Sequence, residues 1–298
     1  MKTKSRKNHL KLTAPDLAFH ILNWTLLILF FLMLAYPLLH VVISSFNADS
    51  KLPLSLLPKH VTMQGYYAVF EYDLFWSGLL NSVINTCLAT VISLVVTVCC
   101  AYPLSRKEFR FGGVMMALCV FTMYFSGGMI PGYLNIKNLG LLDSRFACFL
   151  PSALSVYNMI IVRTYFMNTI PNELHEAATI DGCGQLQRLL KVVLPLSAPV
   201  IAVIALFVAV NEWNSYFGPM LYLDNKDLYP LSLVLREVLI ENSVDVNNMD
   251  PTTIAIMQKR RETMKYSIIV VSTIPMLLIY PLVQKHFTKG IMIGAVKG

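Results

Sequence analysis

Two long apolar runs of the chain are separated by a short polar stretch with the sequence Asn172-Glu-Leu-His-Glu-Ala-Ala-Thr-Ile-Asp-Gly-Cys-Gly184. Pro171 and Asn172 are helix-start signals. Gly182 and Gly184 are expected to stop the helix, because glycine adopts the backbone conformations that end one. The stretch therefore predicts a short helix between two apolar segments.

One face of this helix carries small and apolar residues that would suit contact with another protein. The residues that recur at helical spacing on that face are Leu174, Ala177, Ala178 and Asp181. The two alanines let another backbone approach closely, and the acidic Glu173 and Glu176 suit the positive end of a helix dipole. The pattern favours a docking helix over its alternative, an amphipathic helix lying on a membrane surface.

Composition identifies the chain as a membrane protein. Its 298 residues are 56% hydrophobic and 14% charged, whereas a soluble domain carries roughly 25% charged residues. A membrane-crossing helix needs about 20 apolar residues. The stretches that meet this requirement are Ile21–Ile43, Leu79–Pro103, Val114–Ile130, Phe146–Phe166, Leu196–Phe217 and Ser267–Val283.

The basic residues predict the orientation of these six spans. With a cytoplasmic N-terminus, the inner side collects most of them: Lys2, Lys4, Arg6, Lys7, Lys11, Arg106, Lys107, Arg110, Arg188, Lys191, Lys285, Lys289 and Lys297. The short outer loops carry only Lys51, Lys59, Lys137 and Arg145. We therefore expect both termini and the Glu176 loop in the cytoplasm. The formal net charge of +7 is explained by topology, without nucleic-acid binding.

Several classes of chemistry lack their motifs in this sequence. There is no phosphate-binding G-x-x-x-x-G-K-[ST] loop, no H-E-x-x-H and no G-x-S-x-G. The histidines are scattered singly, and the six cysteines form no C-x-x-C pair, so they are expected to be small buried hydrophobes. Any energy for transport must then come from a partner.

The fifth apolar span ends in Asn211-Glu-Trp-Asn-Ser-Tyr-Phe217, where polar and aromatic side chains alternate. Asn211, Glu212 and Asn214 can hydrogen-bond hydroxyl groups, while Trp213 and Tyr216 offer flat apolar faces. That mixture suits a sugar path. An aromatic belt at the membrane interface, with Glu212 reaching headgroup water, is the equally supported alternative.

Three further polar features lie in or near the spans. Arg163 is expected to snorkel or to contact the cytosolic loop. Asn81, Ser82 and Asn85 recur at helical spacing in the second span and are expected to link helices or to line a cavity. The stretch Ser126-Gly-Gly-Met-Ile-Pro-Gly132 is expected to end the third span in an irregular turn.

The polar loop resembles the E-A-A loop of permease subunits in ATP-binding-cassette (ABC) importers. The matching residues are Glu176-Ala177-Ala178, Asp181-Gly182 and Leu194-Pro195. Further stretches resemble the carbohydrate branch of that family, which is related to the smaller permease of the maltose importer. They are Ser126-Gly127-Gly128, Leu139-Gly-Leu-Leu-Asp143, Trp213-Asn214-Ser215 and the end of the chain, Lys289-Gly-Ile-Met-Ile-Gly-Ala-Val-Lys-Gly298.

The resemblance implies an all-α membrane protein with the six-helix fold of type I ABC importer permeases and cytoplasmic termini. Residues 1–20 would form a basic cytoplasmic segment and residues 21–298 the transmembrane domain, with a coupling loop at about 168–195 and an outer loop at about 218–266. The residues implied to couple to an ATPase are Glu173, Glu176, Ala177, Ala178, Asp181 and Gly182. A tail with Gly294, Ala295 and Lys297 would contact the same ATPase.

The resemblance also implies the partners of the chain. They are a second, homologous permease, two ATPase subunits, an extracytoplasmic sugar-binding protein and membrane lipid. ATP and magnesium would bind the ATPase subunits, so this chain would be a transport subunit without a cofactor or catalytic activity of its own, in the bacterial plasma membrane. The alternatives are a stand-alone secondary transporter or channel, for which no internal repeat is found, and a membrane-embedded enzyme, for which no catalytic constellation is found.

Overall fold

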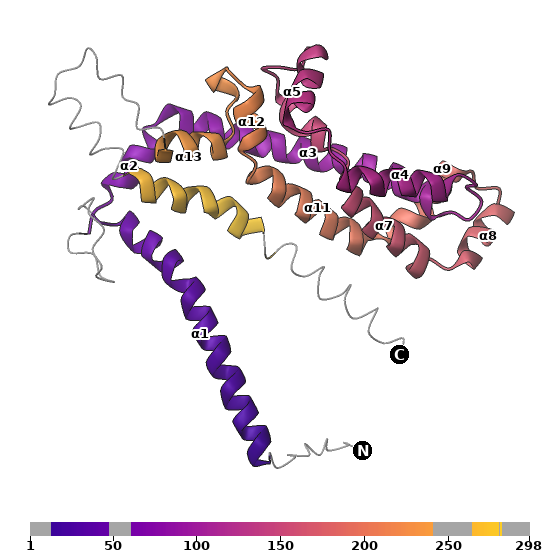
Figure 1. The fold of residues 1–298 in the computed structure, drawn as a ribbon, viewed down its shortest axis with the longest axis horizontal. Coiled ribbons are helices and arrows are strands. Elements are labelled where there is room, and N and C mark those ends of the chain that lie inside the picture. Colours follow the sequence, from indigo (N-terminus) through magenta and orange to yellow (C-terminus); the bar gives the residue numbers. More distant parts are fainter. Residues whose placement is uncertain (1–12, 48–60, 241–263, 280, 282–298) are drawn as a thin grey trace.

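The computed structural model describes residues 13–47, 61–240, 264–279 and 281, and these residues fold into helices and connecting turns. Two of the helices, α1 (Ala14–Ser45) and α3 (Asp73–Ser105), are each long and apolar enough to cross a membrane. The central helix is α3, because α7 (Val156–Thr169), α11 (Ala198–Trp213) and α13 (Leu231–Ile240) all pack along it (Figure 1).

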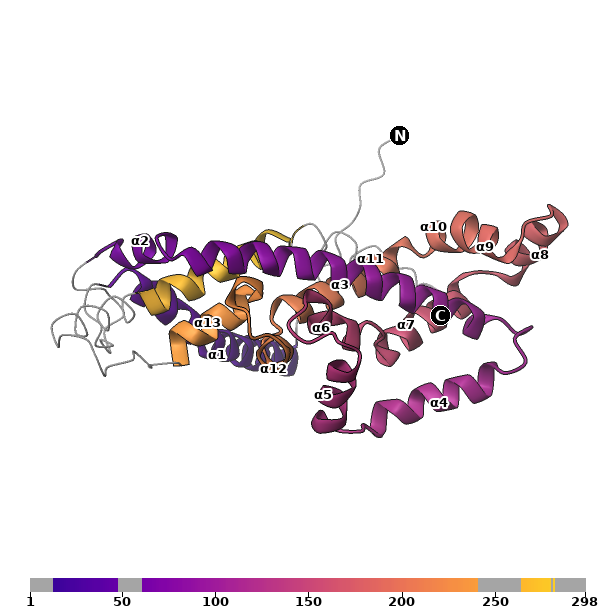
Figure 2. The same ribbon diagram turned by 90° about the horizontal axis from the view of Figure 1, so that it is seen from above.

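The two ends of this elongated body are distinct. Figure 2 shows α2 (Gln64–Phe70) and α13 beside the N-terminal part of α3, and α8 (Asn172–Ile180) beyond its C-terminal part. We call these the α13 end and the α8 end.

Buried apolar side chains form a separate core at each end. At the α8 end, Tyr102 of α3 packs with Met159, Val162 and Phe166 of α7 and with Ile204 of α11. At the α13 end, the core is formed by Ala68, Val69, Phe75, Trp213, Leu231, Met264 and Ile268. The helix Met264–Ile279 therefore closes the α13 end against α2, α3 and α13.

The third expected span does not run as a single helix, so its predicted extent to Ile130 is wrong. The helix α4 (Gly112–Tyr124) stops six residues earlier, and α5 (Met129–Asn138) leaves it at an angle of 112°. The irregular turn expected here is confirmed. Gly128, with φ of +90°, takes a left-handed backbone conformation that other residues avoid.

The fourth span is bent as well, and the chain bends sharply where the expected fifth span begins. The fourth consists of α6 (Arg145–Phe149), the turn η1 (Leu150–Ser152) and α7, with a bend of 52°. Before α11, the chain runs through α9 (Gln185–Arg188), the π-helical turn η2 (Leu189–Val193) and α10 (Leu194–Leu196), and then bends by 83°. The breaks leave polar backbone groups between helices, which is tolerated where they face protein or a cavity.

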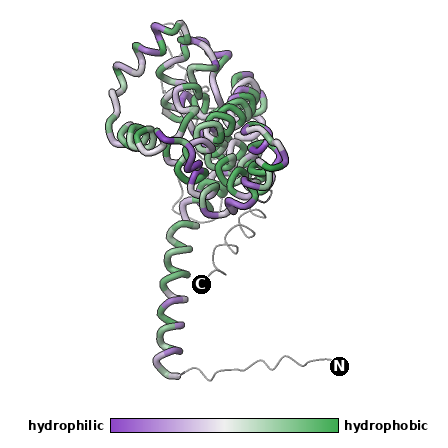
Figure 3. The backbone as a smooth tube through the Cα atoms, turned by 90° about the vertical axis from the view of Figure 1, so that its right-hand side faces the viewer, coloured by the Kyte–Doolittle hydropathy of each residue, from purple (hydrophilic) through white to green (hydrophobic). Residues whose placement is uncertain are grey.

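The first helix, α1, projects away from the body and is coloured as mostly hydrophobic along its length (Figure 3). Its buried residues are Ser44 and Ser45, both in its last turn. The hydroxyl of Ser45 lies 2.7 Å from the hydroxyl of Tyr66, and Ser267 donates a hydrogen bond of 3.2 Å to the Ser45 carbonyl. Within the described part of the chain, α1 is therefore anchored through its last turn.

The prediction that the cysteines are buried is wrong for five of the six. Cys148 is buried, whereas Cys87 and Cys99 are exposed and Cys100, Cys119 and Cys183 are half-buried. Cys87 and Cys99 lie on the exposed face of α3. The apolar composition of a span does not tell which of its faces packs against protein.

Candidate functional site

The helix α8 begins and ends where the sequence predicts. It starts directly after Pro171, whose backbone is extended, and its first turn contains the acidic Glu173. Gly182 ends it with φ of +75°, and the amides of Gly182 and Cys183 donate to the carbonyls of Thr179 and Ala178. These bonds satisfy carbonyls that the helix end leaves without partners. The second expected stop, Gly184, has an ordinary φ of −66°.

The two faces of α8 differ in burial. His175 and Ala178 are buried against the chain's own body. Ala177 is exposed, and so are Leu174 at 41% and Ile180 at 87%. The expectation that both alanines lie on one free face is therefore wrong for Ala178. We call the α8 surface the exposed residues Glu173, Leu174, Glu176, Ala177 and Ile180 of α8 together with Asp181, which directly follows the helix; Asn172 and Thr179 are exposed as well.

The segment after α8 buries only part of the side that its sequence suggests, because Leu189 and Val193 are buried whereas Leu186 and Leu190 are exposed. An apolar stripe of Leu186, Leu189, Leu190 and Val193 would leave Arg188 outside, but Arg188 is only 8% exposed and Leu186 is 68% exposed. Tyr102 of α3 donates a hydrogen bond of 3.1 Å to Gln185, which helps to set this rotation. Sequence reasoning missed the burial of Arg188, because it placed this residue outside the apolar stripe and counted it among the basic residues that set the membrane orientation.

At the opposite end, the polar and aromatic residues that finish α11 line a groove. The cavity has a volume of about 900 Å³ and lies between α11, α13 and the helix Met264–Ile279. Asn211, Trp213, Asn214 and Tyr216 contribute to its wall. Its other polar lining residues are Ser232, Ser272 and Thr273. The groove thus combines aromatic faces with amide and hydroxyl groups, and the rest of its wall is apolar, from Leu206, Phe207, Val210, Leu231, Leu235, Met276 and Leu277.

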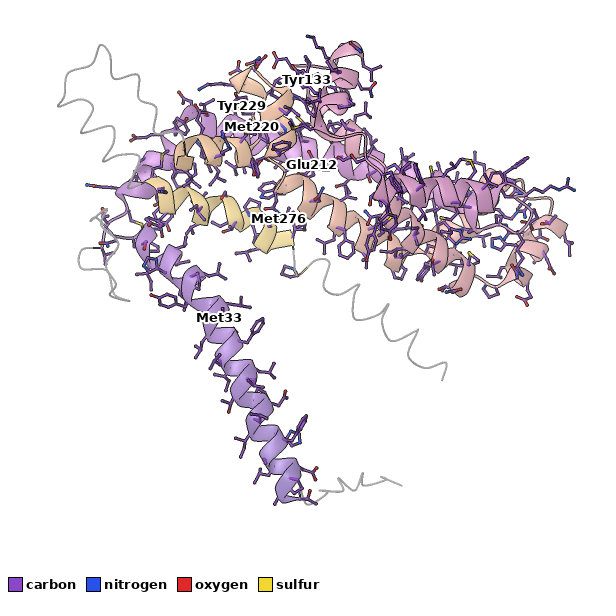
Figure 4. The ribbon with its side chains drawn as sticks, viewed as in Figure 1. Met33, Tyr133, Glu212, Met220, Tyr229 and Met276 are labelled. Carbon is purple, nitrogen blue, oxygen red and sulfur yellow. The ribbon has the colours of Figure 1, made fainter. Side chains whose placement is uncertain are left out.

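Glu212 lines a different cavity of about 270 Å³, between α11, α3 and the start of α7. Figure 4 shows Glu212 at the end of α11 nearest α12 (Phe217–Tyr222), whereas Met276, a wall residue of the larger groove, lies on the neighbouring helix. Glu212 is 8% exposed. Glu212 lines only the smaller cavity and Asn214 only the larger groove, so the expectation that these two residues share one cavity is wrong. Asn211 lines both.

Two of the three polar residues singled out in the second span, Asn81 and Ser82, link helices, one of the two roles expected for them; the buried amide of Asn85 has no hydrogen-bond partner among the described residues. Asn81 donates hydrogen bonds of 2.7 and 3.0 Å to the carbonyls of Asp227 and Tyr229 and accepts one of 2.6 Å from Arg145. Ser82 accepts a bond of 2.8 Å from the Leu231 amide. Sequence reasoning missed the role of Arg145, although its place directly before an apolar helix was a signal.

Arg163 donates a hydrogen bond of 2.8 Å to the carbonyl of Leu104, near the C-terminal end of α3. This contact is to the second span itself, and it satisfies a carbonyl that the helix end leaves free. Across the described part of the chain, no three His, Cys, Asp or Glu side chains gather closely enough to hold a metal ion. The expected tail residues Gly294, Ala295 and Lys297 lie outside the described residues.

Comparison with known proteins shows similarity over nearly the full chain. The family model described as "Binding-protein-dependent transport system inner membrane component" matches residues 13–293. The polygalacturonan/rhamnogalacturonan transport system permease protein YtcP of Bacillus subtilis is 41% identical over 286 residues, which cover 94% of this chain and 98% of that protein.

Two solved structures share the fold. A chain of a bacterial ABC transporter involved in the import of the acidic polysaccharide alginate superposes with a TM-score of 0.82 at 32% identity, covering 96% of this chain and all of that one. A second chain, from an alginate ABC transporter in complex with an alginate pentasaccharide-bound periplasmic protein, gives a TM-score of 0.56 at 13% identity over 90% of this chain and 93% of that one. This second likeness shows the fold alone.

Proposed function

The chain belongs to the family of binding-protein-dependent transport system inner membrane components, and from that premise we propose that it is a permease subunit of an ATP-driven oligosaccharide importer. The observation that carries the proposal is its 41% identity to the Bacillus subtilis permease YtcP over 98% of that protein's length. The names of that relative and of the alginate transporter make uronate-containing oligosaccharides the first substrates to test.

The proposal includes a topology of six spans in the bacterial plasma membrane. Residues 1–20 would form the basic cytoplasmic segment, and both termini and the loop at about 168–195 would face the cytoplasm. The bias of Lys and Arg toward that side supports this orientation. It makes the α8 end cytoplasmic and the α13 end external, with the outer loop at about 218–266.

The proposed partners follow from the family and from the two ends of the body. A second permease would complete the path, and a sugar-binding protein would deliver the substrate at the α13 end. Two ATPase subunits, which would bind ATP and magnesium, would contact the α8 surface and the tail with Gly294, Ala295 and Lys297. The permease itself would then have no catalytic role.

The α8 surface is suited to coupling because it combines a small residue with charged ones. Ala177 leaves room for a close approach, and Glu173, Glu176 and Asp181 can pair with basic groups of an ATPase. Ala178 and Gly182 would contribute indirectly, Ala178 by packing α8 against the body and Gly182 by ending the helix.

The sugar path is proposed along the 900 Å³ groove, with Trp213 and Tyr216 for ring faces and Asn211 and Asn214 for hydroxyls. Glu212 lies on the other side of α11 and would act on the path only through Asn211 and Phe207, the two residues that line both cavities.

The test of the proposal is the variant Ala177→Trp in the importer assembled with its partners and reconstituted into proteoliposomes. Overpacking at a tight contact costs about 1–3 kcal/mol, so ATP-driven oligosaccharide uptake should fall by about tenfold or more. The matched control is Val114→Trp, an exposed position on α4, which should leave uptake near the wild-type level. Normal uptake and normal ATPase co-purification with Ala177→Trp would contradict the coupling role of α8.

A further inference from the structure

A further polar cavity lies at the α8 end, apart from the 900 Å³ groove and the 270 Å³ cavity of Glu212. Its volume is about 400 Å³, and it is enclosed by the loop after α3, the last turn of α7 and the helices α8 and α9. The charged and titratable side chains in its wall are Arg106, Lys107, Glu108, His175, Glu176 and Arg188.

Three basic side chains from three different segments converge on this cavity, and each has a nitrogen without a hydrogen-bond partner. They are Nε of Arg106, Nδ1 of His175 and Nε of Arg188. His175 is 5% exposed and Arg188 is 8% exposed, so bulk water does not solvate them freely. Among the described residues, the side chain of Arg188 donates one hydrogen bond, a long one of 3.4 Å to the Cys183 carbonyl. A buried guanidinium held this loosely is costly unless a further partner is supplied.

The charges around the cavity leave a positive excess. Three cations, Arg106, Lys107 and Arg188, face two carboxylates, Glu108 and Glu176, which gives a net charge of +1 with His175 neutral. Glu108 is paired with Arg106 at 2.9 Å, but its side chain is 68% exposed and therefore screened by water. Burial, and then the nearby Arg106 and Arg188, lower the pKa of His175, while Glu108 opposes them. The cavity therefore favours an anion.

We propose that this cavity binds a phosphate group, and that the headgroup of an anionic phospholipid supplies it. Arginine suits phosphate because its planar guanidinium donates several directed hydrogen bonds. The apolar wall of Phe166, Met167 and Ile170 continues from α7, so a lipid could place its phosphate among the basic groups and its glycerol along that wall. Basic pockets between helices on the cytoplasmic side are typical sites for such headgroups.

The ATPase would leave most of this cavity open, because the basic side chains lie on the side of α8 opposite Ala177 and Ile180, and Glu176 alone borders both the cavity and the α8 surface. His175 is on the inward side of α8, whereas Ala177 and Ile180 face outward. The choice of lipid as the phosphate source depends on the proposed cytoplasmic position of the α8 end. The anion preference itself depends only on the side chains.

The test uses the assembled importer in nanodiscs of phosphatidylcholine, with increasing phosphatidylglycerol in one series and increasing inorganic phosphate in another. Thermal stability and, by native mass spectrometry, retained phosphatidylglycerol are measured. Wild-type stability should rise with phosphatidylglycerol, and Arg188→Gln should weaken the apparent affinity about tenfold or more, as expected for loss of a charged hydrogen bond. The matched control is Lys191→Gln, which removes an exposed charge one turn away and should behave as the wild type.

If Arg188→Gln fails to assemble, Arg106→Gln at the better solvated side of the cavity gives the same comparison. A response to inorganic phosphate but not to phosphatidylglycerol would keep the phosphate site and change its source. If thermal stability responds to neither phosphatidylglycerol nor inorganic phosphate, the proposed site is overturned. The same holds if Arg188→Gln and Lys191→Gln respond equally. Sugar uptake by wild-type proteoliposomes made from phosphatidylcholine tests the transport function separately, so the two failures are distinguishable.

Discussion

The helices α1 and α3 are nearly equal in length, with 32 and 33 residues, and both are apolar enough to cross a membrane, yet they relate differently to the rest of the chain. None of the most apolar 18-residue window of α1 is buried, whereas 33% of the corresponding window of α3 is. Met33 on α1 illustrates the contrast, because it points away from the body in Figure 4 and is 70% exposed.

Polar residues, more than hydropathy, therefore mark the packed side of a membrane helix. An apolar side chain gains little by leaving lipid for protein, since both surroundings are apolar. A polar side chain gains a hydrogen bond there that lipid cannot offer. In α3, the buried Asn81 and Ser82 form such bonds, to the segment of Asp227 and Tyr229 and to Leu231. The side chains of Asn85, Thr86 and Thr97 are buried as well but have no hydrogen-bond partner among the described residues, whereas the buried residues of α1 are the two serines of its last turn.

The sharpest test of this contrast is to remove Asn81. Asn81→Leu deletes three hydrogen bonds and leaves Arg145 without its acceptor, so we expect a loss of roughly 3 kcal/mol in stability. The measurement is the thermal midpoint of the assembled importer in detergent. The paired substitution in α1 is Asn23→Leu, at an exposed position, and it should change stability by about 0.5 kcal/mol or less. Equal losses in the two variants would refute the contrast.

A second test probes the close contact of α3 with α13. A Cβ atom at Gly78 would lie 2.9 Å from Cγ2 of Val234 and 3.4 Å from the backbone of Leu231, so Gly78→Ala should cost about 1–3 kcal/mol. Gly113→Ala on α4 is the matched control, because nothing lies within 4 Å of the added methyl group, and alanine there should be neutral or slightly stabilising. The double variant Gly78→Ala with Val234→Ala should recover part of the loss. No loss with Gly78→Ala would mean that α13 is not held tightly against α3.

The sequence predicted the local features of this fold better than the tertiary ones. Apolar runs located the long helices α1 and α3, and Pro171 and Gly182 located the ends of α8, because these signals act within a few residues. The stop of α4 at Tyr124 was missed, since the apolar run continues through Met129 and Ile130 while Gly128 turns the backbone.

In the candidate site, too, the sequence predicted local features but not tertiary packing. The residues near the end of α11 were found from composition, but their division into two cavities depends on how α3 and α13 pack on opposite sides of that helix. The inward turn of Arg188 depends likewise on tertiary contacts, including the bond from Tyr102 to Gln185, which no local pattern encodes.

The last and smallest effect concerns pH, and it tests whether the C-terminal end of α3 is also held by burial of polar groups. The loop after α3 brings Arg106 and Glu108 beside His175, whose pKa is lowered from 6.5 by burial and by Arg106 and Arg188, with Glu108 acting in the opposite direction. Above pH 6.5 the histidine is neutral in the folded and unfolded states alike, so it adds no pH dependence. As the pH falls below 6.5, the unfolded histidine takes up a proton before the folded one does, and stability is lost until the pH reaches the lowered pKa. In phosphate-free detergent, the thermal midpoint of the wild type should therefore decline more steeply below pH 6.5 than that of His175→Asn, with His20→Asn at an exposed position of α1 as the control for losing a histidine. If His175→Asn declines as steeply as the wild type, then His175 is not held neutral by its surroundings, and the α8 end is as loosely tied to α3 as the free length of α1 is to the body.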